Sequence, residues 1–120
     1  MLVIRRQQME VFRHHMVEQF IDRMIVHVRS TFAEQTRKVS DDGLRQTIRA
    51  GIDQAAQYGV TDEADVQRYL KYVFAYGPDF ATAPRTAWAG EILQAANLNG
   101  TQKMERLGHA ELLVSMRSGS

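Results

Sequence analysis

The chain has 120 residues, with 15 Lys and Arg, 14 Asp and Glu, and no Cys. This length fits one soluble domain, and the lack of Cys excludes disulfide scaffolds, zinc ribbons, iron–sulfur sites and thiol catalysis. The formal net charge of +1 provides no overall attraction to nucleic acid or to an acidic membrane surface.

The first predicted helix runs from about 6 to 37, a stretch without Pro or Gly. Its apolar residues recur at spacings of three and four, and they cover more than half of the helix circumference. Such a helix would be about 45 Å long, against a diameter of about 35 Å for a compact domain of this size. We therefore expect part of its apolar stripe to face a partner, and the candidate residues are Met9, Phe12, Met16, Phe20 and Met24.

Two shorter helices are predicted next, over about 41–57 and about 62–76. Ser40 is placed to cap the first of them, and Gly59 is placed as the left-handed residue that ends it. Thr61 is the expected cap of the second, which ends at a Tyr-Gly-Pro sequence.

The last two helices are predicted over about 84–96 and about 102–115. Pro84 suits the first position of the former helix, and Thr101 is the expected cap of the latter. The inner face of the last helix is expected to include the region 110–113.

These elements predict an all-α fold, a single helical domain over 1–116 with about five helices and a long N-terminal helix. Residues 117–120 are expected to form a flexible tail or an expression remnant. The N-terminus does not have the order of a secretory signal, and no stretch approaches the about 20 apolar residues of a membrane span. We therefore expect a cytoplasmic protein that does not bind membranes.

Six of the aromatic residues lie within twenty positions, and they allow two interpretations. They could form a core between the third and fourth helices. Alternatively, the members with polar tips could anchor a protein interface together with a nearby arginine. The candidates for this interface are Tyr72, Tyr76, Arg85 and Trp88.

His14, Glu18 and Asp22 share one face of the first helix and could in principle hold a divalent metal. The spacing matches no established metal motif, so a solvated polar face with local charge pairs is the favoured interpretation. No pattern of catalytic residues or phosphate-binding loop is present. We expect no metal, no cofactor and no enzymatic activity.

The short turn between the second and third helices also fits a helix-turn-helix motif. However, Asp62, Glu63 and Asp65 would lie at the start of the helix that reads the bases, where carboxylates repel phosphate. We expect no nucleic-acid partner, and a small nucleic-acid-binding regulator is kept as an alternative.

Several short segments of the chain form a recognisable set, and they are Arg49-Ala50-Gly51-Ile52, Tyr58-Gly59, Tyr76-Gly77-Pro78-Asp79-Phe80, Pro84-Arg85 and Trp88-Ala89. These segments resemble a family of small helical bacterial proteins encoded in type VI secretion loci, beside spike-tip (PAAR-type) proteins and toxic effectors. The resemblance implies a chaperone or adaptor that binds a secreted effector or spike component, and it implies no catalytic residues. An immunity protein that neutralises a toxin is the alternative, and a homodimer is also possible.

Overall fold

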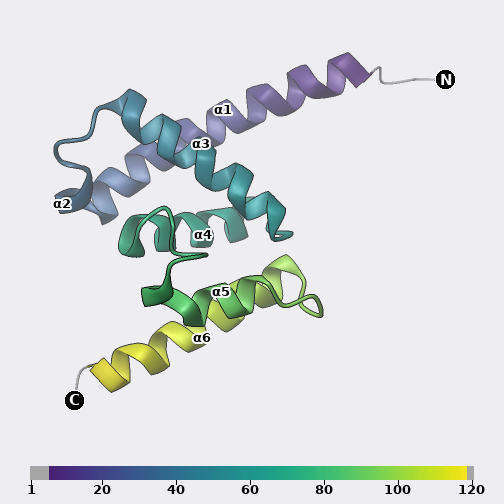
Figure 1. Ribbon diagram of the computed structural model, residues 1–120. Coiled ribbons are helices and arrows are strands. Elements are labelled where there is room, and N and C mark those ends of the chain that lie inside the picture. The colour runs from purple at the N-terminus through teal and green to yellow at the C-terminus, as the bar shows by residue number, and fades with distance from the viewer. Residues whose placement is uncertain (1–5, 119–120) are drawn as a thin grey trace. The chain divides into compact units, whose positions relative to one another are not determined.

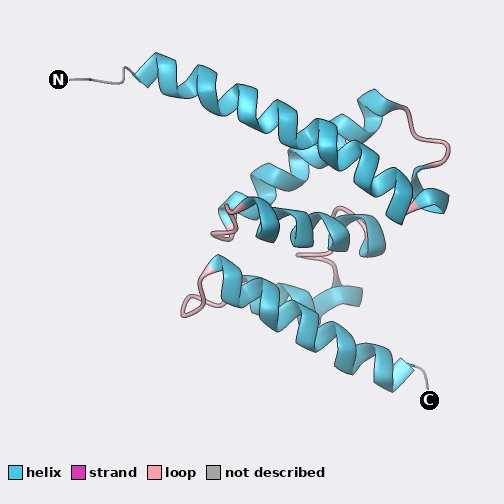
Figure 2. Ribbon diagram, turned by 180° about the vertical axis from the view of Figure 1, so that it is seen from behind, coloured by secondary structure: helices cyan, strands magenta, loops and turns pink. Residues whose placement is uncertain are grey.

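The computed structural model describes the backbone of residues 6–118 and the side chains of residues 14–117. Six α-helices and one short 3₁₀ helix make up this part of the chain, and it contains no strand (Figures 1 and 2). The predicted all-α fold with a long N-terminal helix is confirmed. The residues group into two compact units, Met1–Ile48 and Arg49–Ser120, and we describe each unit by itself.

The first helix, α1 (Arg6–Thr31), has 26 residues and is therefore about 39 Å long. It is shorter than the predicted helix over 6–37, because Phe32 leaves the helical region with a φ of −121° and a ψ of 54°. The single turn α2 (Ala33–Thr36) follows.

The break after α1 is held by one arginine rather than by a Pro or Gly. The guanidinium of Arg29 donates to the backbone oxygens of Thr36 (3.0 Å) and Val39 (2.8 Å). It also donates to the carboxylate of Asp41 (2.7 Å). Backbone carbonyls at the end of a helix have no partner within the helix and need other donors. If the helix continued to residue 37, the backbone oxygens of Thr36 and Val39 and the carboxylate of Asp41 could not all reach Arg29. A tertiary contact thus outweighs local helix propensity.

The third helix, α3 (Asp41–Gln57), has the bounds that the sequence predicts. The hydroxyl oxygen of Ser40 accepts a hydrogen bond from the backbone N–H of Gly43 (3.0 Å), so the predicted cap is confirmed. Gly59, with a φ of 79°, ends the helix as predicted. The N–H groups of Gly59 and Val60 donate to the carbonyls of Ala56 and Ala55, which is the Schellman arrangement. The boundary between the two units lies within α3.

The fourth helix, α4 (Glu63–Tyr76), begins one residue later than predicted. Its N-cap residue is Asp62, so the prediction of Thr61 as the cap is wrong. Gly77 follows the last turn with a φ of 105°, and its N–H donates to the carbonyl of Val73 (2.9 Å). The expected glycine stop is confirmed.

The predicted helix over 84–96 consists of two shorter pieces, the 3₁₀ helix η1 (Pro84–Thr86) and α5 (Ala87–Leu93). Pro84 does begin the segment, as its fixed φ favours. Thr86 separates the two pieces, and its buried hydroxyl donates to the carbonyl oxygen of Phe80 (2.6 Å).

The last helix, α6 (Gly100–Ser118), is longer at both ends than predicted. Asn99 and Gln102 form a capping box, in which each side-chain oxygen accepts from the other residue's backbone N–H (2.8 and 2.9 Å). Thr101 is therefore not the cap, and its hydroxyl donates to Asp65 instead (2.6 Å). The residues 117 and 118 of the expected tail belong to α6, and 119–120 lie outside the described residues.

The second unit is built around a fully enclosed apolar core. Both α5 and α4 contact α6, and α5 also contacts η1. The largest core side chains with relative exposures of 0–2% come from α4, α5, α6 and the connector after α4, and they are Tyr69, Leu70, Phe80, Leu93, Met104 and Leu107. None of the helices in the described range is long and apolar enough to span a lipid bilayer.

Candidate partner-binding surfaces

The apolar stripe predicted on the first helix is divided in the structure. Met16 is 44% exposed, whereas Phe20 and Met24 are each 6% exposed. The side chains of Met9 and Phe12 lie outside the described residues. Of the described members of this stripe, only Met16 is accessible to a partner.

The polar face of α1 anchors a neighbouring helix. Arg45 of α3 donates to the carboxylates of Glu18 (2.7 Å) and Asp22 (2.5 Å). The hydrogen bond to Asp22 is the main reason why the pKa of Arg45 is raised above its ordinary value. Two of the three residues weighed as metal ligands therefore serve a cation of the chain itself. No group of three or more His, Asp or Glu side chains within residues 14–117 is arranged to hold a metal.

The predicted aromatic cluster forms two layers within the second unit. Tyr69 and Phe80 are fully buried, with ring centroids 5.0 Å apart, and Tyr72 is 3% exposed with its ring 5.8 Å from Phe80. Burial raises the pKa of Tyr72 to about 12. Tyr72 is thus a core residue, and the core interpretation holds for this layer.

Tyr76, Trp88 and Arg85 form the outer layer of the cluster. The rings of Tyr76 and Trp88 meet edge to face, with centroids 5.6 Å apart, and both are half-buried. The exposed guanidinium of Arg85 donates to the backbone oxygen of Tyr76 (2.8 Å) and pairs with Asp79 (2.5 Å). The hydrogen bond from Arg85 lowers the pKa of Asp79. This layer combines residue types that are common at the centres of protein interfaces.

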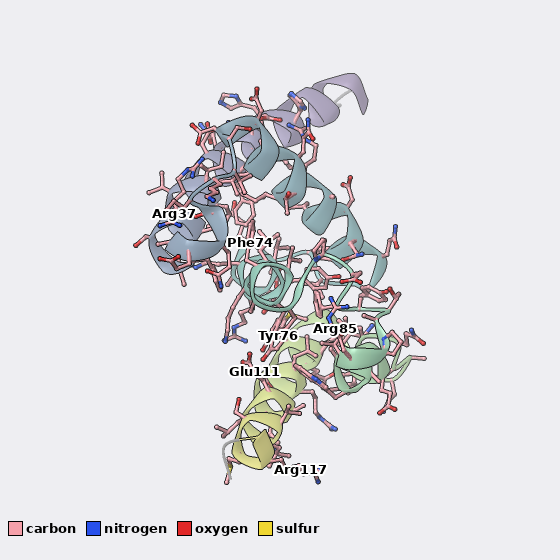
Figure 3. The ribbon with its side chains drawn as sticks, turned by 60° about the vertical axis from the view of Figure 1, so that its left-hand side comes forward. Arg37, Phe74, Tyr76, Arg85, Glu111 and Arg117 are labelled. Carbon is pink, nitrogen blue, oxygen red and sulfur yellow. The ribbon has the colours of Figure 1, made fainter. Side chains whose placement is uncertain are left out.

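One carboxylate joins this aromatic layer to α6. Glu111 accepts hydrogen bonds from the hydroxyl of Tyr76 (2.8 Å) and from the amine of Lys71 (3.2 Å). Figure 3 shows Tyr76 and Glu111 pointing toward one another from α4 and α6. Burial, followed by the bond to Glu111, raises the pKa of Tyr76 to about 12. These contacts fix which side of α6 faces the rest of the unit.

An apolar surface that the sequence did not predict lies near the C-terminal end of α6. Leu112 is 59% exposed, Leu113 is 50% exposed and Met116 is 66% exposed. We call these three residues the α6 patch. The expectation that the region 110–113 faces inward is wrong for Leu112 and Leu113. The inward-facing row of α6 is complete without them, since Met104, Leu107, Glu111 and Val114 follow one another at helical spacing. This spacing was the signal in the sequence that Leu112 and Leu113 lie on another face of the helix.

A polar hollow of about 280 Å³ lies where the loop after α3 meets the starts of α4 and α6. Its lining includes Thr61, Asp62, Asp65 and Thr101. The two helix N-termini would favour an anion, but the carboxylates of Asp62 and Asp65 oppose one. Asp65 already accepts a hydrogen bond from the hydroxyl of Thr101, so this contact joins the starts of α4 and α6. The hollow therefore indicates no class of ligand.

Comparison of the chain with protein-family models, with curated proteins and with solved structures gives no match.

Proposed function

We propose that this chain is a non-enzymatic adaptor that binds a protein partner through the α6 patch. The observation that carries this proposal is that Leu112, Leu113 and Met116 expose half or more of their surface within two turns of one helix. Single exposed apolar residues such as Val26 are ordinary on proteins, but neighbouring ones on one helix are typical of interaction sites.

The outer aromatic layer supports the same proposal from a second position in the same unit. Tyr76 and Trp88 present polar-tipped rings, and Arg85 lies beside them with 56% of its side chain exposed. Aromatic and arginine side chains supply much of the binding energy at protein interfaces. We propose that Met16 of α1 adds a smaller contact, since it is the accessible member of the predicted stripe.

The resemblance described above supplies the class of client. We propose a cytoplasmic role in which the chain holds a secreted effector or a spike-tip protein of a type VI secretion system before export. An apolar surface suits this role, because it can cover an apolar segment of the client until release.

An affinity capture from cells that naturally contain the protein tests the proposal. The bait is the full chain as wild type, as the triple variant Leu112→Gln, Leu113→Gln, Met116→Gln, or as the control Val26→Gln, which removes a 71% exposed apolar residue elsewhere. Gln has nearly the helix propensity of Leu and Met, so the triple variant keeps α6 helical. We expect a partner with wild type and control that is lost with the triple variant. Equal recovery by all three baits would overturn the proposal.

The captured partner then distinguishes an adaptor from an immunity protein. Co-production with an adaptor should raise the soluble yield of the client, while the client's activity is unchanged after release. An immunity protein should instead abolish the partner's toxicity while bound. A role in nucleic-acid binding has weaker support, because the exposed residues at the start of α4 are Asp62 and Glu63, which repel phosphate.

A further inference from the structure

We infer that Asn99 is a modification site that the fold keeps closed. When the start of α6 opens, the chain itself converts Asn99 to aspartate or isoaspartate, and isoaspartate then prevents the helix start from closing again. The chain has two asparagines, Asn97 and Asn99, and only Asn99 is followed by a glycine. The site lies at the other end of α6 from the α6 patch, so it does not depend on the proposed function.

The reaction at Asn99 needs only the next residue and water. The backbone nitrogen of Gly100 attacks the side-chain carbonyl carbon of Asn99, and the proton of this nitrogen leaves with the side-chain amide as ammonia. The product is a five-membered succinimide ring. Water then opens the ring at either of its two carbonyls and gives aspartate or isoaspartate, with no oxidation or reduction. Glycine favours the attack because it has no Cβ to shield its nitrogen.

The capping box opposes this reaction in the folded chain. The side-chain oxygen of Asn99 accepts a hydrogen bond from the backbone N–H of Gln102 (2.8 Å). The backbone N–H of Asn99 donates to the side-chain oxygen of Gln102 (2.9 Å). Ring closure requires the side chain and the following peptide to rotate until the carbonyl carbon meets the nitrogen of Gly100. The two hydrogen bonds oppose this rotation, because it would leave a donor at the helix start unpaired.

The backbone of Gly100 is held from the other side as well. A Cβ added there would overlap the backbone oxygen of Gly59 and would lie 3.0 Å from the Cα of Val60, so the peptide has little room to rotate. Asn99 itself is exposed, so water reaches the site and geometry limits the reaction. Both constraints end when the start of α6 separates from the loop after α3.

The two products differ in what they do to the helix start. In isoaspartate the backbone runs through the side-chain carbons, which adds one methylene before Gly100, where the chain is packed against Gly59. Aspartate keeps the ordinary backbone and caps helices as well as asparagine does. It adds one charge to the hollow that Asp62 and Asp65 line. Isoaspartate therefore marks a chain permanently as one that has opened.

Mass spectrometry of one tryptic peptide tests the inference. Cleavage after Arg85 and Lys103 releases the peptide 86–103, which contains both asparagines. The full wild-type chain is incubated at mildly alkaline pH, either folded or unfolded in guanidinium chloride. Fragmentation of the peptide then assigns each deamidation to Asn97 or to Asn99, and a sample digested before incubation corrects for reaction during the digest.

We expect Asn99 to react about tenfold more slowly in the folded chain than in the unfolded chain, because the helix start must open first. Asn97 is exposed in the same connector and is followed by Leu98, whose side chain shields the attacking nitrogen, so it should react slowly in both states. Equal rates at Asn99 in the two states, or no reaction in the unfolded chain, would overturn the inference.

Two matched substitutions test whether the capping box closes the site. Gln102→Ala removes the oxygen that accepts the N–H of Asn99, and it should raise the rate in the folded chain about fivefold, as expected from the loss of one hydrogen bond. Gln35→Ala makes the same change at an exposed position in the other unit and should leave the rate unchanged. An equal rise in both variants, or a rise in neither, would count against the inference.

A further comparison separates the added charge from the altered backbone. Asn99→Asp carries the charge of the product on an ordinary backbone. Wild-type chains deamidated in guanidinium chloride are separated by ion exchange, and their isoaspartate is identified with an isoaspartyl methyltransferase. We expect the isoaspartate chains to unfold at a lower guanidinium concentration than Asn99→Asp, which should unfold close to wild type. Equal midpoints for the isoaspartate chains and Asn99→Asp would show that the helix start closes again and would overturn the inference.

Discussion

The two halves of α6 differ in what their side chains touch. In the first half, a Cβ added to Gly100 would overlap the backbone oxygen of Gly59, so the helix start is packed directly against a loop. Lys103 is buried and donates to the carbonyl of Tyr58, and Leu107 is fully enclosed. This half is therefore part of the core of the second unit.

The second half is attached on one side only. Glu111 binds Tyr76 and Lys71, whereas Leu112, Leu113 and Met116 remain exposed. The contrast shows that the first half of α6 belongs to the core, whereas the second half exposes apolar side chains. Substitutions in its first half should report on folding, and substitutions of the exposed apolar residues in its second half should report on binding without loss of stability.

The largest expected effect comes from Leu107, which is 0% exposed. Leu107→Ala should lower the free energy of unfolding by about 3 kcal/mol, because it removes buried methyl groups and leaves a cavity. Urea denaturation followed by circular dichroism measures this loss. Leu113→Ala makes the same chemical change in the other half and should cost less than about 0.5 kcal/mol. Equal losses in the two variants would remove the distinction between the halves.

The next largest change in the free energy of unfolding is expected at Gly100. Gly100→Ala should lower the free energy of unfolding by about 2 kcal/mol, because the new methyl group collides with the Gly59 carbonyl and the backbone must shift. Gly108 is the matched control in the same helix, since a Cβ there would lie 3.9 Å from the hydroxyl of Tyr72, an ordinary contact. Gly108→Ala should raise stability by up to about 1 kcal/mol through helix propensity. If both substitutions stabilise the protein, the inference that Gly100 packs tightly against Gly59 is wrong.

The attachment of the second half is tested at Tyr76. Tyr76→Phe should lower the free energy of unfolding at neutral pH by about 1 kcal/mol, because the bond to the Glu111 carboxylate is lost. The effect should be measured by urea denaturation beside wild type.

The burial of Tyr76, together with its bond to Glu111, has a consequence at alkaline pH. Folding raises the pKa of Tyr76 from 10.0 to about 12, so the phenol is neutral in the folded state at pH values where the unfolded chain has begun to ionise. The stability that this shift provides is complete below pH 10 and is lost as the pH rises toward 12. Wild type should therefore lose stability over this range more steeply than Tyr76→Phe. If the free energy of unfolding falls equally with pH in the two proteins, the raised pKa of Tyr76 is contradicted.

Local chemistry explains which helix ends could be predicted from the sequence. Ser40, Gly59 and Gly77 act within one or two turns of their own position, so residue type and spacing suffice. Thr101 has the right chemistry for a cap, but its hydroxyl bonds to Asp65, 36 residues away in sequence. The end of α1 likewise depends on contacts beyond its own last turn, because Arg29 bonds to the backbone oxygens of Thr36 and Val39, 7 and 10 residues further along the chain.

The candidate surfaces were harder to predict because spacing alone does not say what covers a residue. Tyr72 and Tyr76 lie one turn apart on α4, yet Phe80 packs on Tyr72 and leaves Tyr76 at the edge. Met16 and Phe20 share a stripe in the same way, and only Met16 is accessible. Helical periodicity identifies the faces of a helix, but the packing of segments distant in sequence determines which residue of a face remains exposed.

The smallest expected change in stability is also the most informative about function. Leu112→Gln with Leu113→Gln should alter the free energy of unfolding by no more than about 0.5 kcal/mol, because both side chains are at least half exposed and Gln is nearly as good a helix former as Leu. The double variant should be measured by urea denaturation and by capture of the native partner. A stable variant that no longer recovers the partner assigns binding to this half of α6. A loss of stability close to that of Leu107→Ala would instead show that the second half of α6 belongs to the core, and the exposed apolar side chains would then need another explanation.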